Sequence, residues 1–332
     1  EKAEGLPVYE NAERKTAIAG SEVKANRPAE NTLMIDFCDL QLGDSSFADM
    51  HVGAASRKVF MHYGFIRNPW NHFTQFKDYI VRRDTFSVGT GFTTTYRFTI
   101  DDKVDYHAFR AVIEQGHLWK EVKVNNQPVT PVADKWWLDR SFSVLAVGQY
   151  LKPGTNILTI TANPMSVFAE IEPVYILGDF NLASASKGWQ IVPSQPIRTG
   201  SWKNQGLSLY GFDVVYTKDF NVAKKENTYQ IQLGDWKGTV AAVKVNGEDA
   251  GIIFSEPNTL DVSSLIREGT NHVEVKVVGS LKNLLGPHHN NPRPGMVGPH
   301  HWWNIERYPS GKEYDTYDYG LMTDFELWEM AK

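Results

Sequence analysis

The sequence predicts an all-β protein made of two tandem jelly-roll or β-sandwich domains, with a short helical insertion in the first. Two duplicated segments carry this prediction. The segment VKVNNQPV at 122–129 recurs as VKVNGEDA at 243–250, and YLKPGTNILTI at 150–160 recurs as LIREGTNHVEV at 265–275. Short alternating strands between Gly, Pro and Asn turns are typical of sandwiches and jelly rolls. A repeat of this length indicates a duplicated domain.

Each duplicated segment has the pattern of a strand and a tight turn. Val-Lys-Val-Asn alternates apolar and polar side chains, which is typical of a strand with one buried face. Asn-Asn at 125–126 and Asn-Gly at 246–247 tolerate positive φ, so both predict hairpins. Lys-Pro-Gly at 152–154 predicts a turn before the alternating strand 157–161, and the strand 272–277 has the same place in the second copy. We therefore expect Asn125 and Asn246 at equivalent hairpins.

The domain organisation follows from where these patterns begin and end. Residues 1–30 are polar and weakly patterned, which predicts a linker or a strap. We expect the first sandwich at 31–180 and the second at 181–332, interrupted by a long loop at 279–319. The apolar segment 175–180 at the boundary predicts a buried, rigid junction.

Further elements are predicted along the chain. In the first domain a strand begins at 31–38 and places Cys38 as a buried apolar residue. Residues 49–65 follow as a helix that Gly64 ends. In the second domain the alternation at 210–216 and 322–328 predicts further strands.

Composition excludes several classes of function. The chain has 332 residues, of which 22% are charged, and a net charge of −5. It therefore offers no electrostatic case for nucleic acid or for an anionic membrane surface. No apolar run is long enough to span a membrane, and the first residues do not form a signal peptide. The chain also lacks an initiator Met, so we expect a processed form or a piece of something longer. With one cysteine, no intrachain disulfide can form.

Six motifs, taken in order, carry a resemblance to a known family. They are NTLMIDFC at 31–38, NPW at 68–70, EIEPVYILGDF at 170–180, QGLSLYG at 205–211, VSSLIREGTN at 262–271 and SLKNLLGPHH at 280–289. Together they resemble the C-terminal part of large α-L-rhamnosidase-like glycoside hydrolases of polysaccharide-degrading Bacteroidetes. In that family the C-terminal modules are similar to the family 2 sugar-binding domain, a galactose-binding-like jelly roll. Nothing in this chain resembles the catalytic barrel.

The resemblance implies a non-catalytic, carbohydrate-associated pair of modules that binds glycan or braces a catalytic domain. Its partners would be a glycan or polysaccharide and the catalytic domain of the same polypeptide, with no nucleic acid and no membrane. It also implies a periplasmic or extracellular location. Two alternatives stay open: a free-standing glycan-active hydrolase that uses the His/Trp/Asp loop of the second sandwich, and a purely structural or adhesive protein.

Glycosidases use two carboxylates across the scissile bond, so paired carboxylates are candidate catalytic groups. The candidate pairs are Glu170 with Glu172, Asp315 with Asp318, and Asp324 with Glu326. Residues i and i+2 on a strand share a face, yet such pairs usually belong to the solvated face. We therefore assign no catalytic residue. No cofactor is required, although a Glu on the last strand is compatible with a structural calcium ion.

The loop at 286–303 is the most distinctive local sequence, because it carries two Gly-Pro-His-His units, at 286–289 and 298–301. Its histidines are candidate ligands of a transition metal, but adjacent residues on extended backbone point to opposite sides, so we favour an ordered or ligand-facing loop. If the chain binds glycan, an aromatic side chain would stack on the sugar and imidazole or guanidinium groups would bind its hydroxyls. The predicted ligand-binding residues are Trp302, Trp303, His300, His301 and Arg293.

Overall fold

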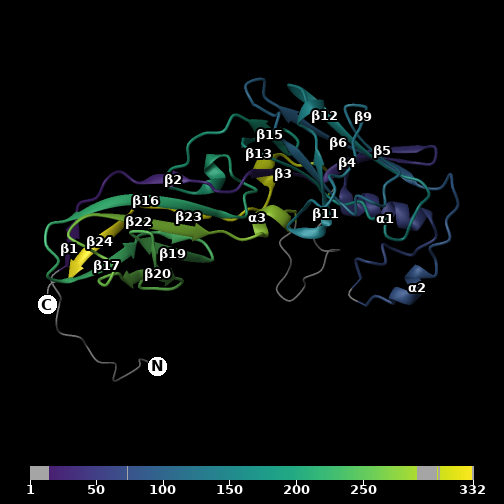
Figure 1. Ribbon diagram of the computed structural model, residues 1–332. Helices are drawn as coiled ribbons and strands as arrows, with labels where there is room; N and C mark the ends of the chain where they lie inside the picture. The colour runs from purple at the N-terminus through teal and green to yellow at the C-terminus, as the bar shows by residue number, and fades with distance from the viewer. Residues whose placement is uncertain (1–14, 73, 290–304, 306, 331–332) are drawn as a thin grey trace.

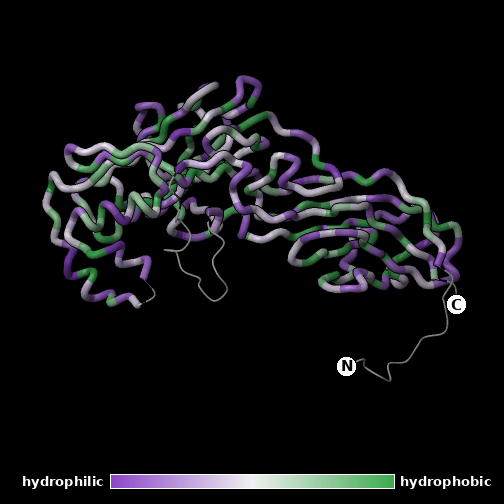
Figure 2. The backbone as a smooth tube through the Cα atoms, turned by 180° about the vertical axis from the view of Figure 1, so that it is seen from behind, coloured by the Kyte–Doolittle hydropathy of each residue, from purple (hydrophilic) through white to green (hydrophobic). Residues whose placement is uncertain are grey.

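The computed structural model describes residues 15–72, 74–289, 305 and 307–330, and confirms the predicted all-β class. The chain forms two sandwiches that lie side by side (Figure 1). Figure 2 shows polar and apolar residues alternating along the strands of both. The described helices are α1 (Val52–His62), α2 (Lys77–Val81) and α3 (Lys282–Leu285), with short 3-10 turns at Gly148–Tyr150, Trp202–Gln205 and Gly311–Glu313.

The first sandwich packs two sheets against each other. One has the order β10-β11-β7-β13-β3, and the other the order β14-β15-β6-β12-β8-β9, with β4 paired to β6 and β5 to β4. The strands are β3 (Asn31–Ile35), β4 (Phe37–Leu42), β5 (Ser45–His51), β6 (Phe92–Ile100), β7 (Arg110–Glu114), β8 (Glu121–Val124), β9 (Gln127–Pro128), β10 (Trp136–Trp137), β11 (Asp139–Ala146), β12 (Gly154–Ala162), β13 (Val174–Gly178), β14 (Asn181–Ser184) and β15 (Trp189–Val192).

The second sandwich has sheets of order β1-β24-β17-β21 and β2-β16-β22-β19-β20, with the small pair β18-β23 beside them. Its strands are β1 (Lys15–Ile18), β2 (Lys24–Asn26), β16 (Asp213–Val222), β17 (Thr228–Leu233), β18 (Trp236–Lys237), β19 (Val240–Val245), β20 (Glu248–Ile253), β21 (Thr259–Asp261), β22 (Gly269–Val278), β23 (Gly320–Leu321) and β24 (Phe325–Met330).

The sheet orders repeat the duplication seen in the sequence. The run β6-β12-β8-β9 of the first sandwich corresponds to β16-β22-β19-β20 of the second. On the opposite sheets, β11-β7-β13-β3 corresponds to β21-β17-β24-β1. The two halves therefore share one topology as well as short sequence motifs.

The predicted equivalence of Asn125 and Asn246 is confirmed by their hydrogen bonds. Both have positive φ, 49° and 54°. The Asn125 Nδ2 donates to Asn156 Oδ1 at 2.8 Å, and the Asn246 Nδ2 donates to Asn271 Oδ1 at 3.0 Å. The Oδ1 of Asn125 also accepts from the Ile157 N–H, and the Oδ1 of Asn246 accepts from the His272 N–H in the same way. One asparagine pair thus ties the hairpin to the neighbouring turn in both sandwiches.

The N-terminal segment and the domain boundary differ from the prediction. Residues of the expected 1–30 linker form β1, which pairs with β24, and β2, which pairs with β16. They therefore belong to the second sandwich, and the first sandwich is inserted between parts of the second. Local patterns do not predict these strands because both are short and mostly exposed. Residues 181–192 form β14 and β15, which join the sheet of the first sandwich through β6.

The segment predicted to form the junction is buried, but most of it lies inside a sheet of the first sandwich and not between the two sandwiches. Every residue of β13 is buried, and the strand lies between β7 and β3 inside a sheet of the first sandwich. The contact with the second half begins just after it. The side chain of Asn31 donates to the carbonyl oxygens of Phe180 and Gly206, at 2.9 and 3.1 Å. Arg27 forms an ion pair with Asp179 at 2.5 Å.

The helical insertion matches the expected segment. Helix α1 begins after His51, whose ring caps it, and Gly64 follows its end with φ 84°. In Figure 1, α1 and α2 lie at the end of the first sandwich that is remote from the second. Cys38 is buried on β4 as predicted. Among the described residues, no helix has the length and apolarity that crossing a membrane requires.

Candidate functional site

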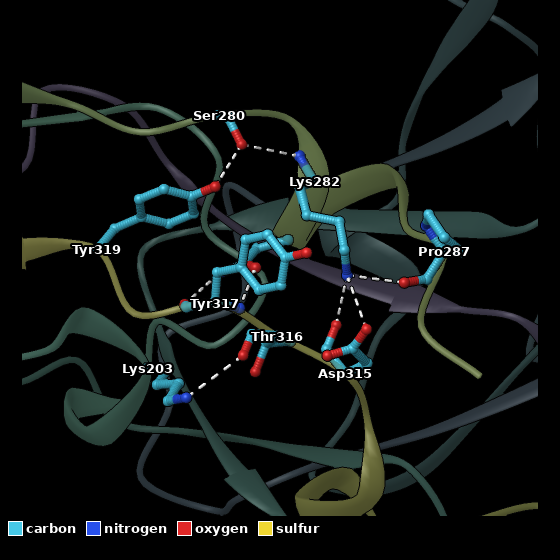
Figure 3. Close-up of polar contacts among 9 residues, drawn as sticks. Lys203, Ser280, Lys282, Pro287, Asp315, Thr316, Tyr317 and Tyr319 are labelled. Atoms are coloured by element: carbon cyan, nitrogen blue, oxygen red, sulfur yellow. Dashed lines mark hydrogen bonds and ion pairs between the residues drawn. The ribbon is translucent and has the colours of Figure 1, made fainter. Parts of the chain in front are cut away.

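The five residues predicted to bind glycan, Arg293, His300, His301, Trp302 and Trp303, lie outside the described residues. That prediction therefore stays a prediction. The described ends of the same loop are held together by polar contacts, which Figure 3 shows.

Lys282 is the centre of this anchoring (Figure 3). Its Nζ donates to the carbonyl oxygens of Pro287 and Asp315, both at 2.7 Å. Burial lowers the pKa of Lys282, and the nearby Asp315 carboxylate opposes that shift. The side chain of Asn283 adds a reciprocal pair, because it donates to the Tyr317 carbonyl at 2.8 Å and accepts from the Tyr317 N–H at 2.7 Å. The two ends of the loop are thereby fixed to each other.

The first His-His pair of the loop is buried against the first sandwich. The ring of His289 hydrogen-bonds through Nε2 to Asp36, which also accepts from the Tyr314 hydroxyl at 2.6 Å. Burial alone would raise the pKa of Asp36, but these partners and His51 hold it below its ordinary value. Among the described residues, neither ring nitrogen of His288 has a hydrogen-bond partner, and burial lowers the pKa of His288 to about 4.

Asp36, His51 and His289 place one potential ligand atom each within 4.8 Å of one another, which makes the cluster a candidate metal centre. The Nδ1 of His51 accepts a hydrogen bond from the Gly53 N–H at 3.1 Å. A neutral ring that accepts at Nδ1 carries its proton on Nε2, which is the atom facing Asp36 at 3.9 Å. A protonated nitrogen has no lone pair for a metal. The cluster is therefore better described as a hydrogen-bonded clamp between the loop and the first sandwich.

Two of the three carboxylate pairs have structural partners. Asp315 pairs with Lys282, and Asp318 accepts from Ser201 at 2.6 Å. Asp324 pairs with Lys218 at 2.5 Å, and Glu326 is exposed on β24. These carboxylates neutralise nearby lysines or face solvent, and nothing in their contacts indicates a catalytic role.

The third pair, Glu170 and Glu172, is different because both side chains line a pocket of about 720 Å³ in the first sandwich. The residue between them, Ile171, is buried in the core. The segment precedes β13 (Val174–Gly178) and is not part of a strand, but both carboxylates still face the same pocket. A third carboxylate, that of Glu114 at the end of β7, lines the same pocket.

Aromatic side chains form the walls of this pocket. Trp70 and Phe168 stack with their ring centroids 5.8 Å apart and their planes inclined by 20°. The indole N–H of Trp119 donates to the Glu114 carbonyl at 2.8 Å, which fixes that ring beside the acidic group. The remaining lining is mostly polar and comprises Gln75, Lys77, Gln115, His117 and Leu118. We refer to the cavity lined by these residues as the acidic pocket.

The carboxyl groups of the acidic pocket resist ionisation. Burial raises the pKa of Glu170 from 4.5 to about 7, although a hydrogen bond from Asn68 at 2.7 Å opposes the shift. Burial and the neighbouring carboxylates of Glu170 and Glu114 raise the pKa of Glu172 well above its ordinary value. Burial also raises the pKa of Glu114, with a contribution from Asp139. Perturbed carboxyl groups in a concave, aromatic-lined site are typical of functional sites.

Sequence reasoning considered Glu170 and Glu172 but missed the rest of the pocket. Trp70 lies in a turn, Glu114 and Trp119 flank the β7–β8 connection, and Phe168 precedes Glu170. Their meeting depends on the pairing of distant strands, which local patterns do not specify. The aromatic content of 10 Trp, 14 Tyr and 17 Phe was the available signal, but it does not say which rings leave the core.

A second cavity, of about 480 Å³, lies on the outer face of β6. Its charged groups are already paired, Arg97 with Asp39 and Lys187 with Asp49. The acidic pocket is larger, and its carboxyl groups form no ion pair with any residue that the structure describes, so it is the stronger candidate site.

No family model matches this chain. Part of it is 33% identical, over 92 residues, to a putative beta-glucuronidase of Formosa agariphila. That match covers 26% of this chain and 8% of the relative, so the chain spans a small fraction of that protein's length.

Several solved structures to which this chain is similar are those of glycoside hydrolases. A rhamnosidase from Novosphingobium sp. PP1Y is 17% identical with a TM-score of 0.30, and the match covers 73% of this chain and 23% of that enzyme. An α-L-rhamnosidase of Streptomyces avermitilis, solved with L-rhamnose, is 13% identical with a TM-score of 0.32 and coverages of 94% and 30%. A β-D-glucuronidase of Dictyoglomus thermophilum is 10% identical with a TM-score of 0.28 and coverages of 71% and 38%.

Proposed function

We propose that this chain is a carbohydrate-binding pair of β-sandwich modules from a glycoside-hydrolase-related protein, and that its acidic pocket binds the glycan. The observation that carries the proposal is the composition of that pocket, where Trp70, Trp119 and Phe168 stand around three carboxyl groups. The 92-residue similarity to a putative beta-glucuronidase supports the connection to carbohydrate.

The pocket has the two kinds of surface that a sugar ring requires. One face of a pyranose presents C–H groups, which pack well on an aromatic ring, and its rim presents hydroxyls that need hydrogen-bond partners. Phe168 is 42% exposed and offers the free aromatic face. Glu170, Glu172 and Gln75 offer oxygen and nitrogen atoms to the hydroxyls.

Glycan binding is tested best by substitution at an exposed position, where the fold does not depend on the side chain. Phe168→Ala removes an exposed ring and should leave the fold intact, whereas Phe254→Ala removes a ring that is 68% exposed on the second sandwich. In calorimetric titration with a panel of neutral, amino and acidic oligosaccharides, we expect Phe168→Ala to weaken binding roughly ten-fold or more. Phe254→Ala should bind like the parent chain. Equal affinity of both variants, or no binding of any glycan by the parent chain, would reject the proposal.

A second candidate function is glycoside hydrolysis, which the pKa of Glu170 favours. A carboxyl group with a pKa near 7 is suited to donate a proton to a leaving oxygen, and Glu114 would then have to be the ionised carboxylate that acts as base or nucleophile. Release of reducing sugar from a bound glycan, abolished in Glu170→Gln, would support this candidate. Binding without turnover would support the non-catalytic role.

The wider setting is also a proposal. We place the chain outside the cytoplasm, in the periplasm or the extracellular space, with a catalytic domain of the same polypeptide as its partner. In that setting the second sandwich would brace the catalytic domain, and the first would hold the glycan. The loop containing Trp302 and Trp303 stays a predicted second contact, and Trp302→Ala and Trp303→Ala in the same titration would test it.

A further inference from the structure

The helical insertion of the first sandwich has the opposite charge to the chain as a whole. Residues 52–88 contain six Lys or Arg residues and two Asp residues, whereas the whole chain has a net charge of −5. The six are Arg57, Lys58, Arg67, Lys77, Arg82 and Arg83. None of them forms an ion pair with a residue that the structure describes, unlike Lys218, for example, which pairs with Asp324. The insertion therefore presents positive charge that the described part of the chain does not neutralise.

Part of this positive charge lies beside the acidic pocket. The side chain of Lys77, at the start of α2, lines the pocket itself. Arg67 is exposed and comes directly before Asn68, whose amide donates to the Glu170 carboxylate at 2.7 Å. A ligand that fills the pocket and extends towards α2 would therefore meet these cations.

Arg83 ties the two helices of the insertion together. Its guanidinium donates to the carbonyl of Gly64, which follows α1, at 2.7 Å. The same group lies over the rings of Phe65 and Tyr79, at 3.8 and 5.8 Å from their centroids. The segment after α1 and the end of α2 thus form one surface at this end of the sandwich (Figure 1). We refer to the basic side chains on it as the basic rim, which consists of Arg67, Lys77, Arg82 and Arg83.

Apolar side chains are exposed on the same surface. Ile66 is 85% exposed, Phe76 is 70% exposed and Tyr79 is 62% exposed. An exposed aromatic ring can stack on the C–H face of a sugar. A guanidinium group binds a carboxylate or a similar oxyanion through two parallel hydrogen bonds. Rings and cations side by side therefore suit a chain of sugars that carry acidic groups.

We propose that the glycan held in the acidic pocket is itself acidic, and that its carboxylate or sulfate groups bind the basic rim. This inference rests on the proposed function, because it names the class of glycan that the pocket binds. One sugar ring would occupy the pocket between Trp70 and Phe168, and the rings next to it would extend over α2.

The carboxyl groups of the pocket are compatible with an acidic ligand. The pKa of Glu170 is raised to about 7, and the pKa of Glu172 is raised well above its ordinary value. At about pH 6 both groups therefore mostly hold their protons, whereas uronic acids and sulfates are ionised. A protonated carboxyl group can donate a hydrogen bond to a sugar oxygen and does not repel an anion.

The test compares ligands that differ only in charge. Calorimetry at about pH 6 would measure an oligomer of galacturonic acid against its methyl ester, and a sulfated galactose oligomer against its desulfated form. One exposed ion pair is worth up to about five-fold in affinity, so two or three at the rim should favour the acidic member of at least one pair roughly ten-fold. Raising the salt from about 0.1 M to about 1 M should remove most of this preference, because the screening length falls from roughly 10 Å to roughly 3 Å.

A double variant locates the preference. Arg67 and Arg82 are exposed, and their side chains form no hydrogen bond within the described part of the chain, so Arg67→Gln with Arg82→Gln should keep the fold. We expect this variant to lose at least about three-fold of the preference and to bind the uncharged oligomers like the parent chain. Arg140→Gln with Arg267→Gln removes the same charge at exposed positions elsewhere and should keep the preference. Thermal unfolding checks the fold of both variants, and the salt dependence of the parent chain is an independent measurement.

The outcomes separate this inference from the proposed function. If both uncharged oligomers bind as tightly as their acidic counterparts, the inference is wrong and glycan binding stands. If the preference survives in the Arg67 and Arg82 variant, or is unchanged at high salt, the basic rim does not cause it and the inference is also wrong. Binding of vesicles that contain anionic lipid, without binding of any acidic oligomer, would assign the rim to a membrane surface instead. If no oligomer binds and the wider glycan panel also fails, the proposed function itself falls.

Discussion

Replacement of Glu170 by Gln should stabilise the protein in a pH-dependent way. The pKa of this carboxyl rises from 4.5 to about 7 on burial. In a group with a raised pKa, the folded state prefers the proton, so ionisation is penalised only above the unfolded pKa. The penalty is therefore absent below pH 4.5, grows as the pH rises, and is complete above about pH 7.

The magnitude follows from the size of the shift. One pKa unit corresponds to about 1.4 kcal/mol, so the shift corresponds to about 3 kcal/mol in the free energy of unfolding. Gln retains an oxygen that can accept from Asn68, so the hydrogen bond at 2.7 Å is preserved in the variant. Glu170→Gln should thus be more stable than the parent chain by up to about 3 kcal/mol at pH 8, and nearly equal to it at pH 4.5.

Urea unfolding followed by tryptophan fluorescence would measure both proteins at the two pH values. Glu326→Gln, on the exposed face of β24, controls for the loss of one negative charge from the whole protein. A gain that is the same at both pH values, or a loss at pH 8, would refute the assignment of a buried, reluctantly ionised carboxylate at Glu170.

Two further predictions concern other parts of the fold. Asn156→Ala and Asn271→Ala should each lower the free energy of unfolding by about 3 kcal/mol. The reason is that each buried amide joins its hairpin to a turn through equivalent hydrogen bonds. Urea unfolding would measure both losses, and very unequal losses would contradict the equivalence. His288 is held neutral, with its pKa lowered to about 4 from 6.5, so stability should be lost as the pH falls from 6.5 towards 4. Thermal unfolding at pH 7 and pH 5 should show a smaller acid loss in His288→Phe than in the parent chain, and equal losses would exclude this role.

The hairpins were predictable from sequence because their determinants are local. Alternating side chains choose the buried face of a strand, and an Asn-Gly or Asn-Asn pair supplies positive φ wherever it stands. Both requirements are met within a few residues of Asn125 and of Asn246. The same reasoning found α1 and its end at Gly64, since capping and helix termination are also local.

The acidic pocket was not predictable because its character depends on tertiary packing. The spacing of Glu170 and Glu172 indicates a common face but does not say whether that face meets water. In the structure Trp119 and Glu114 arrive from the β7–β8 connection and Trp70 from the turn after α1, and together they enclose the two carboxylates. The usual interpretation, a solvated pair, is correct for Asp324 and Glu326 and wrong here, because the residues that enclose Glu170 and Glu172 are distant from them in the chain.

The interleaving of the sandwiches explains why the pocket has a fixed place in the molecule. Because β1 and β2 belong to the second sandwich, the chain crosses between the two on both sides of the first. Leu209, Leu284 and Tyr314 from the second half are buried in the hydrophobic core of the first. A hinge between the sandwiches would expose these side chains and break the contact of Tyr314 with Asp36. We therefore expect the two sandwiches to move as one rigid body, and a glycan in the acidic pocket would be held at a constant position relative to any surface that the second sandwich contacts.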